Sequence, residues 1–427
     1  MDVTRNLQIT QSPVVVVGLG YVGLTLSVFL ANKGVDVLGV ESDVSLNSEI
    51  IQGKSPFFEK DFDAELSRVI HNGKLQVFES IPQVVNASLF IVCVGSKLEE
   101  IRNIREKITA IISSIEDSNT SKKYVFLRST LPVGTTFLIQ GATKDSSMTR
   151  VIFCPERTIE GAALRELQSL PQLIGGDLEE DSEMAENFFQ SVGIETVRLK
   201  SSAHAEFAKL ISNTFRDVTF GISNEFAFLA EAQDLDYIHI REAAAKGYER
   251  MAHLPAPGPS SGPCLRKDGL ILMSQADLGK ISLIAAAQDR NSLIFKWILK
   301  KINIVNNEKL IKKIAILGAS FKGRPVTSDT RDSFANTIAD ELNRELPSCR
   351  VEIFDTHLLN SNPFPTTLYE RLEECIKSSD LVVLQNNDPF FGSQNFILLL
   401  EKYQVQVLDL WNQVTYYKKV CTWGGGT

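Results

Sequence analysis

The sequence predicts an α/β protein with two doubly wound parallel-sheet domains joined by a central helical segment. Three observations predict this class. Up to residue 200, short runs rich in Val, Ile and Phe alternate with helix-length segments, as expected for strands buried on both faces of a sheet. From about Ser201 to Ile302, long helical stretches replace the strands. The alternation of strands and helices returns at Lys313.

The expected strands form two groups. They are residues 14–20, 35–40, 89–95, 123–130 and 150–156 in the first half, and residues 313–318, 351–355, 381–385 and 405–410 near the end. The clearest helices are expected at residues 60–70, 99–115, 205–232 and 333–346. The predicted domains are residues 1–200, 201–302 and 303–427, with a hinge near Lys300, Lys301 and Asn306.

The composition limits the classes of function. A chain of 427 residues, with 44% hydrophobic and 22% charged residues, predicts a globular protein of more than one domain. The net charge of -8 argues against a nucleic-acid-binding surface. The six cysteines include no CxxC pair and the five histidines lack metal-ligand spacing, so neither a disulfide framework nor a metal site is expected.

One apolar segment, Val14 to Ala31, has about the length of a short membrane span. Its three glycines, two hydroxyl residues and tyrosine instead favour a strand followed by a buried helix. The polar residues before it differ from the basic start of a secretion signal. We therefore expect a cytoplasmic protein that does not bind membranes.

The first strand ends in a glycine motif typical of a Rossmann-like domain. Gly18, Gly20 and Gly23 form GxGxxG between a strand and a helix. In that context the first glycine permits a tight turn, the second lets the backbone approach a pyrophosphate, and the third allows close packing. Glu41 ends the next strand, where an acid that binds the ribose is expected, and no arginine follows it, which favours NAD over NADP. The alternative is a glycine-rich turn that binds nothing.

Cys264 differs from the other cysteines in its surroundings. It ends a Pro-, Gly- and Ser-rich loop, residues 255–263, and has Arg266 and Lys267 beside it. Such surroundings favour a reactive thiolate. The other five cysteines are expected in strands, helices or the tail, as small buried hydrophobic residues. Local chemistry alone supports a catalytic and a structural role for Cys264 equally.

Further polar residues lie where a site could form. Lys209 and Asn213 are spaced i,i+4 on an expected helix, where they could stabilise an oxyanion or simply belong to a solvated face. Glu156 and Glu160 follow one strand and Thr130 follows another, at the rim where α/β sheets bind ligands. A glutamate there can be a general base or cap the next helix, and the hydroxyl can merely form a turn.

Eight segments together resemble one known family. They are GLGYVGL (18–24), GKSPFFE (53–59), STLPVGTT (129–136), CPERTIEG (154–161), AEFAKLISNTFRDV (205–218), GPCLRKD (262–268), LGASFK (317–322) and SDTRDS (328–333). In type and order they resemble the UDP-glucose/GDP-mannose dehydrogenase family over nearly the whole chain. The resemblance implies a Rossmann domain for NAD, a helical dimerisation segment and a C-terminal domain for the nucleotide of a UDP-sugar substrate. It also implies a homodimer.

The resemblance implies a role for each matching residue. Cys264 would be the nucleophile, Lys209 and Asn213 would stabilise the oxyanion, Asp268 with Thr130 would position water, and Glu160 would be the general base. The cofactor would contact the glycine motif and Glu41. It would also contact Tyr21, Val22, Ser96 and Thr130. Substrate contacts are expected from Glu156, Arg157, Lys209, Asn213, Arg216, Arg250, Lys322 and Arg331. The implied reaction oxidises a sugar CH2OH to a carboxylate in two steps through a Cys264 thioester.

Three segments depart from the family pattern: the rim segment 92–100, the loop before Cys264, and residues 321–331. The loop is shorter and less glycine-rich than the common GxGxGGxC form, with Ser260, Ser261 and Pro263 in its place. Arg216 followed by Asp217 resembles the branch that oxidises UDP-N-acetylhexosamines, so UDP-GlcNAc or UDP-ManNAc is the expected substrate. UDP-glucose and GDP-mannose remain alternatives. So do a β-hydroxyacid dehydrogenase and a nucleotide-binding module without turnover.

Overall fold

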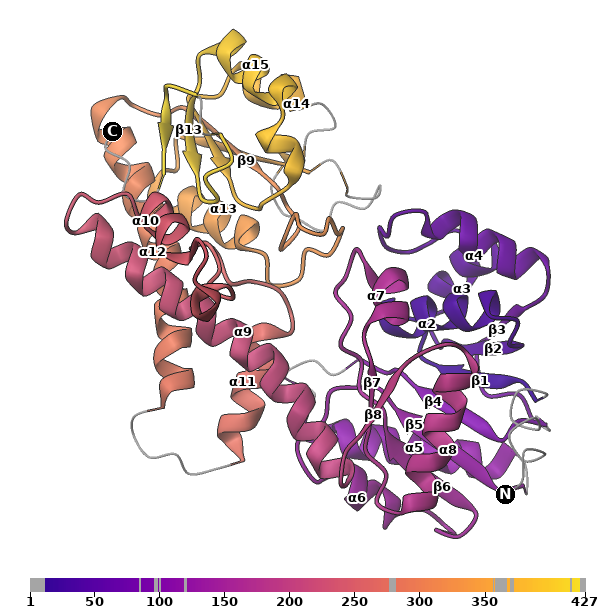
Figure 1. The fold of residues 1–427 in the computed structure, drawn as a ribbon. Coiled ribbons are helices and arrows are strands. Elements are labelled where there is room, and N and C mark those ends of the chain that lie inside the picture. The colour runs from indigo at the N-terminus through magenta and orange to yellow at the C-terminus, as the bar shows by residue number, and fades with distance from the viewer. Residues whose placement is uncertain are drawn as a thin grey trace. The chain divides into compact units, whose positions relative to one another are not determined.

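The computed structural model describes residues 12–83, 86–95, 99, 101–118, 121–275, 282–355, 357, 367–368 (backbone only), 372–414 and 417–422. The chain divides into two compact units, Met1–Ser212 and Asn213–Thr427, and helix α9 (Ser202–Glu231) crosses the division. Each unit contains one six-stranded sheet (Figure 1). The predicted α/β class with two parallel sheets is confirmed.

The sheet of the N-terminal unit has the strand order of dinucleotide-binding domains. Its strands are β1 (Val14–Val17), β2 (Val37–Val40), β3 (Leu75–Phe78), β4 (Leu89–Val92), β5 (Lys123–Leu127) and β6 (Thr149–Phe153). All pair in parallel, in the order β3-β2-β1-β4-β5-β6. Because side chains alternate along a strand, Val14 and Val16 belong to one hydrophobic core while Val15 and Val17 belong to another. Both faces of the sheet are therefore covered.

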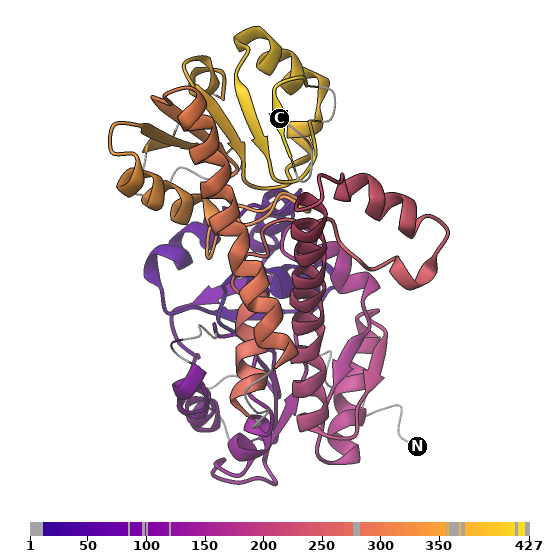
Figure 2. The ribbon, with the colours of Figure 1, turned by 90° about the vertical axis from the view of Figure 1, so that its left-hand side faces the viewer.

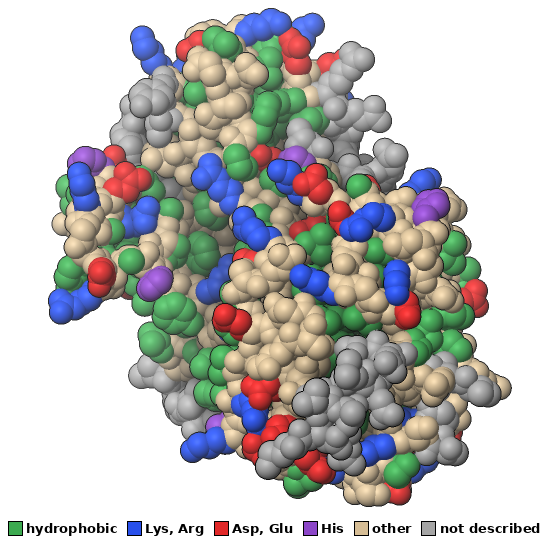
Figure 3. All heavy atoms as spheres, turned by 45° about the vertical axis from the view of Figure 1, so that its right-hand side comes forward, with side chains coloured by type: hydrophobic (Ala, Val, Ile, Leu, Met, Phe, Trp, Pro, Cys, Tyr) green, Lys and Arg blue, Asp and Glu red, His purple; other side chains and the backbone are tan. Residues whose placement is uncertain are grey.

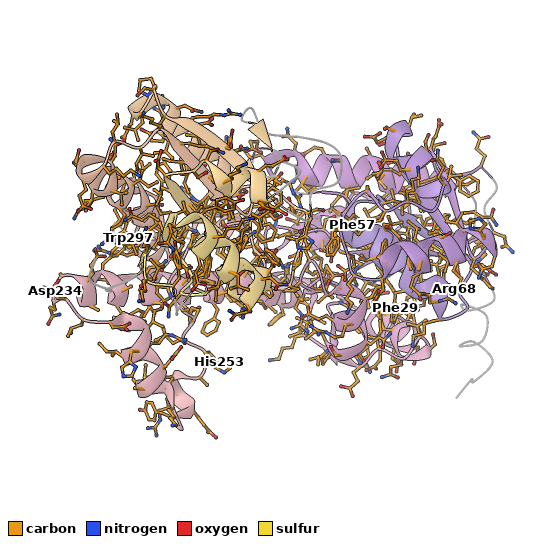
Figure 4. All side chains as sticks on the ribbon, turned by 90° about the horizontal axis from the view of Figure 1, so that it is seen from above. Phe29, Phe57, Arg68, Asp234, His253 and Trp297 are labelled. Atoms are coloured by element: carbon orange, nitrogen blue, oxygen red, sulfur yellow. The ribbon has the colours of Figure 1, made fainter. Side chains whose placement is uncertain are left out.

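Helices and a small two-stranded sheet complete this unit. They are α2 (Tyr21–Asn32), α3 (Val44–Ile51), α4 (Phe62–His71), η1 (Ile101–Asn103), α5 (Ile104–Ser118), α6 (Thr135–Gln140), α7 (Ala163–Ser169), β7 (Gln172–Ile174), α8 (Glu179–Ser191) and β8 (Thr196–Arg198). The apolar segment from Val14 to Ala31 is β1 followed by α2, as predicted. Figure 4 labels Phe29 and Phe57, which pack in the core of this unit, and Arg68, which is exposed.

Two long helices dominate the start of the second unit. α9 is followed by α10 (Tyr237–Ala245), η2 (Glu249–Met251), α11 (Leu265–Ser274) and α12 (Leu283–Glu308). α9 and α12 run side by side in Figures 1 and 2. A Cβ on Gly221 would lie 2.9 Å from the backbone of Ala287, so this glycine permits the close approach. Trp297 of α12 donates to Glu231 at the end of α9, before the turn that contains Asp234 (Figure 4).

The second sheet is also wholly parallel. Its strands are β9 (Lys313–Leu317), β10 (Arg350–Phe354), β11 (Thr367–Leu368), β12 (Leu381–Leu384), β13 (Gln406–Asp409) and β14 (Val420–Cys421), in the order β11-β10-β9-β12-β13-β14. The helices around it are α13 (Phe334–Glu345), α14 (Leu372–Lys377), η3 (Pro389–Gly392) and α15 (Gln394–Tyr403). The predicted second sheet is thus confirmed.

One expectation about the chain's organisation is wrong. Lys300, Lys301 and Asn306 were expected in a hinge but lie in the last turns of α12. Lys301 forms an ion pair of 2.8 Å with Glu231, so packing against α9 stabilises helix where the sequence is polar. The division into three domains at residues 200 and 302 stays a prediction.

The surface carries both signs of charge. In Figure 3, Lys and Arg side chains are interspersed with Asp and Glu over the visible face. Among the described helices, none combines the length and the hydropathy that a membrane crossing needs.

Candidate active site

The glycine motif forms a tight turn that is open on one side. β1 ends at Val17 and α2 begins at Tyr21, so Gly18 to Gly20 make the whole connection. Gly18 has a φ of +89°, and a Cβ on Gly23 would lie 1.8 Å from the Gly18 carbonyl oxygen. A Cβ on Gly20 would meet no protein atom within 4 Å. The exposed backbone at Gly20 therefore leaves room for a pyrophosphate.

Glu41 lies directly beside this turn. It follows β2, and its carboxylate accepts hydrogen bonds from the Leu19 N–H at 2.9 Å and the Asp43 N–H at 3.1 Å. The predicted ribose-binding acid is thus fixed at the carboxyl edge of the sheet, next to the glycine turn. Its contact with a cofactor stays a prediction.

A hydrogen-bonded cluster joins the glycine turn to the loop that carries Glu160. The Tyr21 hydroxyl donates to the Glu59 carboxylate, and the Gly161 N–H donates to both, at 2.8 Å each. Burial, followed by the Glu59 hydrogen bond and charge, raises the pKa of Tyr21, so its hydroxyl stays protonated. Glu59 was not predicted as a site residue. Its signal in the sequence is its place at the end of GKSPFFE (53–59), one of the segments that resemble the family.

Glu156 and Arg157 bond to the protein itself. The buried Arg128 guanidinium forms an ion pair with the Glu156 carboxylate, which also accepts from the Arg157 N–H at 2.7 Å and from the Thr158 N–H. The Arg157 guanidinium donates to the Pro171 carbonyl. Burial alone would raise the pKa of Glu156, but Arg128 and the N–H donors hold it below the usual range. Both side chains thus fix the conformation of their loop, and their substrate contacts stay predictions.

Glu206 ties the loop after β5 to α9. Its wholly buried carboxylate accepts from the Gly134 N–H and from the Thr136 N–H and hydroxyl at 2.8 and 2.6 Å. Burial raises the pKa of Glu206. Thr130 lies in this loop, and Lys209 lies one helical turn after Glu206 on α9, with 8% of its surface exposed. Ser96, predicted to contact the cofactor, lies outside the described residues.

In the second unit, Cys264, Asp268 and Asn213 form one group. Cys264 is exposed at the N-cap of α11, where the N–H groups of the first turn favour negative charge. Asp268, in the first turn of α11, is wholly buried, and its N–H donates to the Cys264 carbonyl at 3.1 Å. Its carboxylate accepts from the Asn213 amide at 2.7 Å. The structure thus brings together three residues that were predicted to be catalytic.

The other five cysteines are less exposed to solvent than Cys264. Cys93, Cys154, Cys349 and Cys375 are buried, and Cys421 is half-buried in β14. Burial raises the pKa of Cys93 to about 12 and that of Cys349 to about 11, so these thiols stay protonated at neutral pH. Cys264 is the exposed cysteine of the six, as expected.

The loop before Cys264 is fixed by side chains of α9. The Asn224 carboxamide accepts from the Gly258 N–H at 2.9 Å and donates to the Gly258 carbonyl at 3.2 Å. The Ser223 hydroxyl donates to the Pro255 carbonyl at 2.7 Å. The loop therefore has a defined conformation despite its glycines. Figure 4 labels His253, in the segment that leads into this loop.

A second strand edge repeats the arrangement seen at Glu41. Asp355 follows β10 and accepts from the Ala319 N–H at 2.8 Å and from the Ser320 N–H and hydroxyl at 2.9 and 2.7 Å, in the loop after β9. Next to it, His357 Nε2 lies 3.1 Å from an Asp388 oxygen, and this hydrogen bond raises the pKa of His357. Asp355 was not predicted. The signal for it was a Gly-x-Ser turn after one strand and an acid after the next.

The four remaining predicted substrate contacts also belong to the second unit. Lys322 lies over the Phe321 ring at 5.4 Å, and Arg331 is exposed, with its guanidinium paired to Asp329 at 2.9 Å. Arg250 is exposed and stacks over Tyr248 at 5.5 Å. Arg216 is exposed on α9. Some of the predicted site residues therefore lie in the N-terminal unit and the others in the second unit. That they form one site stays a prediction.

Comparison with known proteins identifies relatives along most of the chain. Two models of the UDP-glucose/GDP-mannose dehydrogenase family match, the NAD binding domain at residues 12–193 and the central domain at residues 203–292. UDP-N-acetyl-D-mannosamine dehydrogenase of Methanocaldococcus jannaschii is 30% identical over 378 residues, which cover 86% of this chain and 84% of the relative. The protein of that name from Pyrococcus horikoshii is 28% identical over 396 residues, or 90% and 91%.

Solved structures match over nearly the full length. The structure of a UDP-D-ManNAc dehydrogenase from Pyrococcus horikoshii has a TM-score of 0.81 at 25% identity and covers 96% of this chain and 99% of its own. That of a UDP-glucose dehydrogenase from Pyrobaculum islandicum has a TM-score of 0.82 at 20% identity, covers 96% of each chain, and shares the fold. Together with the glycine turn and the exposed cysteine, these matches define an NAD-dependent nucleotide-sugar dehydrogenase. The chain belongs to the UDP-glucose/GDP-mannose dehydrogenase family, which confirms the resemblance in its motifs.

Proposed function

We propose that this enzyme oxidises the C6 alcohol of a UDP-N-acetylhexosamine to a carboxylate in two steps, through a thioester on Cys264. The observation that carries the proposal is the group of Cys264 and Asp268 at the start of α11 with Asn213 of α9, in which an exposed cysteine is the N-cap of a helix. A family of NAD-dependent nucleotide-sugar dehydrogenases needs a nucleophile to retain the intermediate aldehyde, and this cysteine fits that role.

Each proposed residue has a defined chemical task. The Cys264 thiolate adds to the aldehyde carbon, and the resulting oxyanion is stabilised by Lys209 and Asn213. After the second oxidation, Thr130 and Asp268 position the water that breaks the C–S bond, and the thiolate leaves. Glu160 accepts the proton of the C6 alcohol as general base. Asn213 already bonds Asp268 at 2.7 Å, which fixes the orientation of both side chains.

The substrate class rests on two supports. Relatives along 86% and 90% of the chain are named UDP-N-acetyl-D-mannosamine dehydrogenases. The exposed Arg216 could donate a hydrogen bond to an N-acetyl carbonyl, and Arg250 could reach the site of a partner subunit. We assign the uridine diphosphate to the C-terminal sheet, with Lys322 and Arg331 as its cations, because both follow β9 at the carboxyl edge of a parallel sheet.

A panel of UDP- and GDP-sugars, scored by NADH and by the carboxylate formed, tests this proposal. We expect UDP-N-acetylhexosamines to give two NADH for each carboxylate. Preference for UDP-glucose or GDP-mannose would change the assigned substrate only. One NADH for each product would exclude the thioester route and favour a β-hydroxyacid type of dehydrogenase, and no turnover with any sugar would favour a nucleotide-binding module.

The residues present fit NAD. The turn at Gly20 leaves space above the backbone, Tyr21 and Val22 begin the helix whose N-terminus would meet the pyrophosphate, and Glu41 is placed for a ribose. When bound, NAD would accept a hydride from the C6 carbon in each oxidation. The serine and aspartate that follow Glu41 offer no cation for a 2′-phosphate, which favours NAD over NADP.

Gly20→Ala is expected to weaken NADH binding by about tenfold or more, or about 1.4 kcal/mol, with an unchanged melting temperature. The added Cβ meets no protein atom within 4 Å and the φ of −64° suits alanine, so only a ligand is obstructed. Fluorescence titration of NADH measures the effect. Gly141→Ala is the control, since its φ of −68° and its contacts beyond 3.5 Å also tolerate alanine. Equal affinities of the two variants would contradict the cofactor assignment.

We also infer a homodimer that forms along α9. Six large hydrophobic side chains on this helix are exposed: Phe207, Ile211, Phe215, Ile222, Phe226 and Leu229. At 100° per residue they fall within about a 100° arc, so they form one apolar stripe. A stripe of this length usually marks an interface. A second copy fits it because a helix of this kind can pack against itself about a two-fold axis.

Phe215→Glu is expected to weaken the dimer by about 30-fold or more, or about 2 kcal/mol, because a charge would be buried at the centre of the stripe. Phe215 is 59% exposed in the single chain, so the fold should tolerate the change. Analytical ultracentrifugation measures the dissociation. Leu398→Glu on α15, where the leucine is 51% exposed, is the matched control. A monomeric wild type, or a Phe215 variant as dimeric as the control, would refute this interface.

A further inference from the structure

Two serines just before Cys264 bond its loop to two different segments of the chain. The Ser260 hydroxyl donates to the Asp217 carboxylate of α9 at 2.9 Å. The Ser261 hydroxyl donates to the Phe321 carbonyl, in the segment after β9, at 2.8 Å. Both side chains are half-buried, and neither backbone has a positive φ. Glycine, which is usual in this loop in the family, could form neither bond and would add backbone freedom.

The partner of Ser260 is itself fixed. Asp217 is buried, with 2% of its surface exposed. Its carboxylate also accepts from the Asn291 amide at 2.8 Å and the Gln288 amide at 3.1 Å, both on α12. A second bond of 3.0 Å joins the Asn291 amide to the Asp217 carbonyl. Ser260 therefore bonds to a carboxylate of α9 that hydrogen bonds from α12 also hold in place.

The partner of Ser261 lies among the predicted nucleotide contacts. Phe321 directly precedes Lys322, and its own N–H donates to the Asp329 carbonyl at 2.9 Å. The Gly262 N–H approaches the Asp332 carbonyl at 3.4 Å. The segment 321–332 is thus bonded to two consecutive residues of the cysteine loop. Only Pro263 separates the second of these residues, Gly262, from Cys264.

We propose that Ser260 and Ser261 are positioning residues for Cys264, which they hold between α9 and the nucleotide-binding segment. This inference rests on the proposed function. The first oxidation makes an aldehyde without Cys264. The sulfur must then form a C–S bond to the aldehyde carbon while the carbonyl electron pair moves to oxygen, before the second hydride leaves that carbon. Misplacement of the sulfur by about 1 Å can slow such a step about 100-fold. Loss of the tethers therefore slows capture of the aldehyde more than its formation.

The test compares Ser260→Ala, Ser261→Ala and the double variant of the full chain with wild type, using the best sugar of the substrate panel. Free aldehyde is trapped with a hydrazine, and NADH, carboxylate and melting temperature are measured. Ser379→Ala is the matched control, because that hydroxyl also donates to a backbone carbonyl, at 2.7 Å, but far along the chain, in the connection between α14 and β12. Ser260→Thr and Ser261→Thr retain the hydroxyl.

We expect the alanine variants to release aldehyde and to form carboxylate about 10- to 100-fold more slowly, with fewer than two NADH for each sugar consumed. The KM for NAD should equal that of the control, and the threonine variants should recover. Carboxylate rates like the control's, or both oxidations slowed equally, would overturn the positioning role. Cys264→Ser separates the two proposals: if it forms carboxylate at a tenth or more of the wild-type rate, the thioester itself is wrong.

Discussion

Cys264→Ser is expected to lower the rate of carboxylate formation by about 1000-fold or more, while the first oxidation continues and aldehyde accumulates. A serine alcohol is a far weaker nucleophile than a thiolate at neutral pH, and an ester is displaced by water less readily than a thioester. The helix N-terminus at Cys264 favours a thiolate but cannot ionise an alcohol in its place.

The measurement is the amount of carboxylate and trapped aldehyde formed over time, together with NADH. Cys421→Ser is the control, since Cys421 is the next most accessible cysteine and lies in β14. Wild-type protein should also lose activity to a small alkylating reagent, and bound UDP-sugar should protect it. A Cys264 variant that retained a tenth or more of wild-type carboxylate formation would remove this residue from the mechanism.

Arg128→Met is expected to reduce the free energy of unfolding of the N-terminal unit by about 3–5 kcal/mol, because it leaves the Glu156 carboxylate buried without its cation. For a unit of this size, the melting temperature should fall by about 10 °C. Calorimetry or thermal fluorescence measures the change. Arg68→Met is the control, because its ion pair with Glu65 is exposed and contributes less than about 1 kcal/mol.

The effect of Arg128 should depend on pH. The folded pKa of Glu156 is below its ordinary value, so the stability it contributes is present above that ordinary value and is lost as pH falls through the folded pKa. In Arg128→Met the carboxylate should prefer to be protonated, and the deficit relative to wild type should shrink toward pH 4. Arg128→Met/Glu156→Gln should recover much of the stability at pH 7. A deficit independent of pH would show that packing, not charge, dominates.

The fold was predictable because its strongest signals are local. Val14 to Val17 and Ile314 to Leu317 are apolar runs too short for helices, and the glycine motif after the first of them allows few other turns. The residues after the Pro-rich loop predict a helix that resumes only after Asp268, whereas α11 begins at Leu265, directly after Cys264. The sequence does not indicate this earlier start, because the Pro-rich loop precedes it and no serine, threonine or aspartate occupies the N-cap position.

Candidate site residues could be named from the sequence, and their functional roles stay predictions. The residues to which they bond could not be foreseen in most cases. Arg128 and Glu156 are 28 positions apart, and no periodicity in the sequence indicates that they pair. Lys301 was assigned to a hinge because the sequence around it is polar. Its ion pair with Glu231 depends on tertiary packing, which the sequence alone does not show. Asp355 is different: the glycine turn and following acid that identified Glu41 occur a second time, and the same reasoning would have found it.

The hydrogen bond between Glu41 and the Leu19 N–H has a consequence for cofactor engineering. Conversion of an NAD enzyme to NADP usually removes the acid at this position, so that a 2′-phosphate can be accepted. Here the same carboxylate also closes the glycine turn, at 2.9 Å from the Leu19 nitrogen. An alanine would remove the negative charge and the turn's acceptor together. Replacement by asparagine or serine would keep an acceptor on this side chain, so redesign should begin from those residues, with an arginine added in place of Ser42 or Asp43.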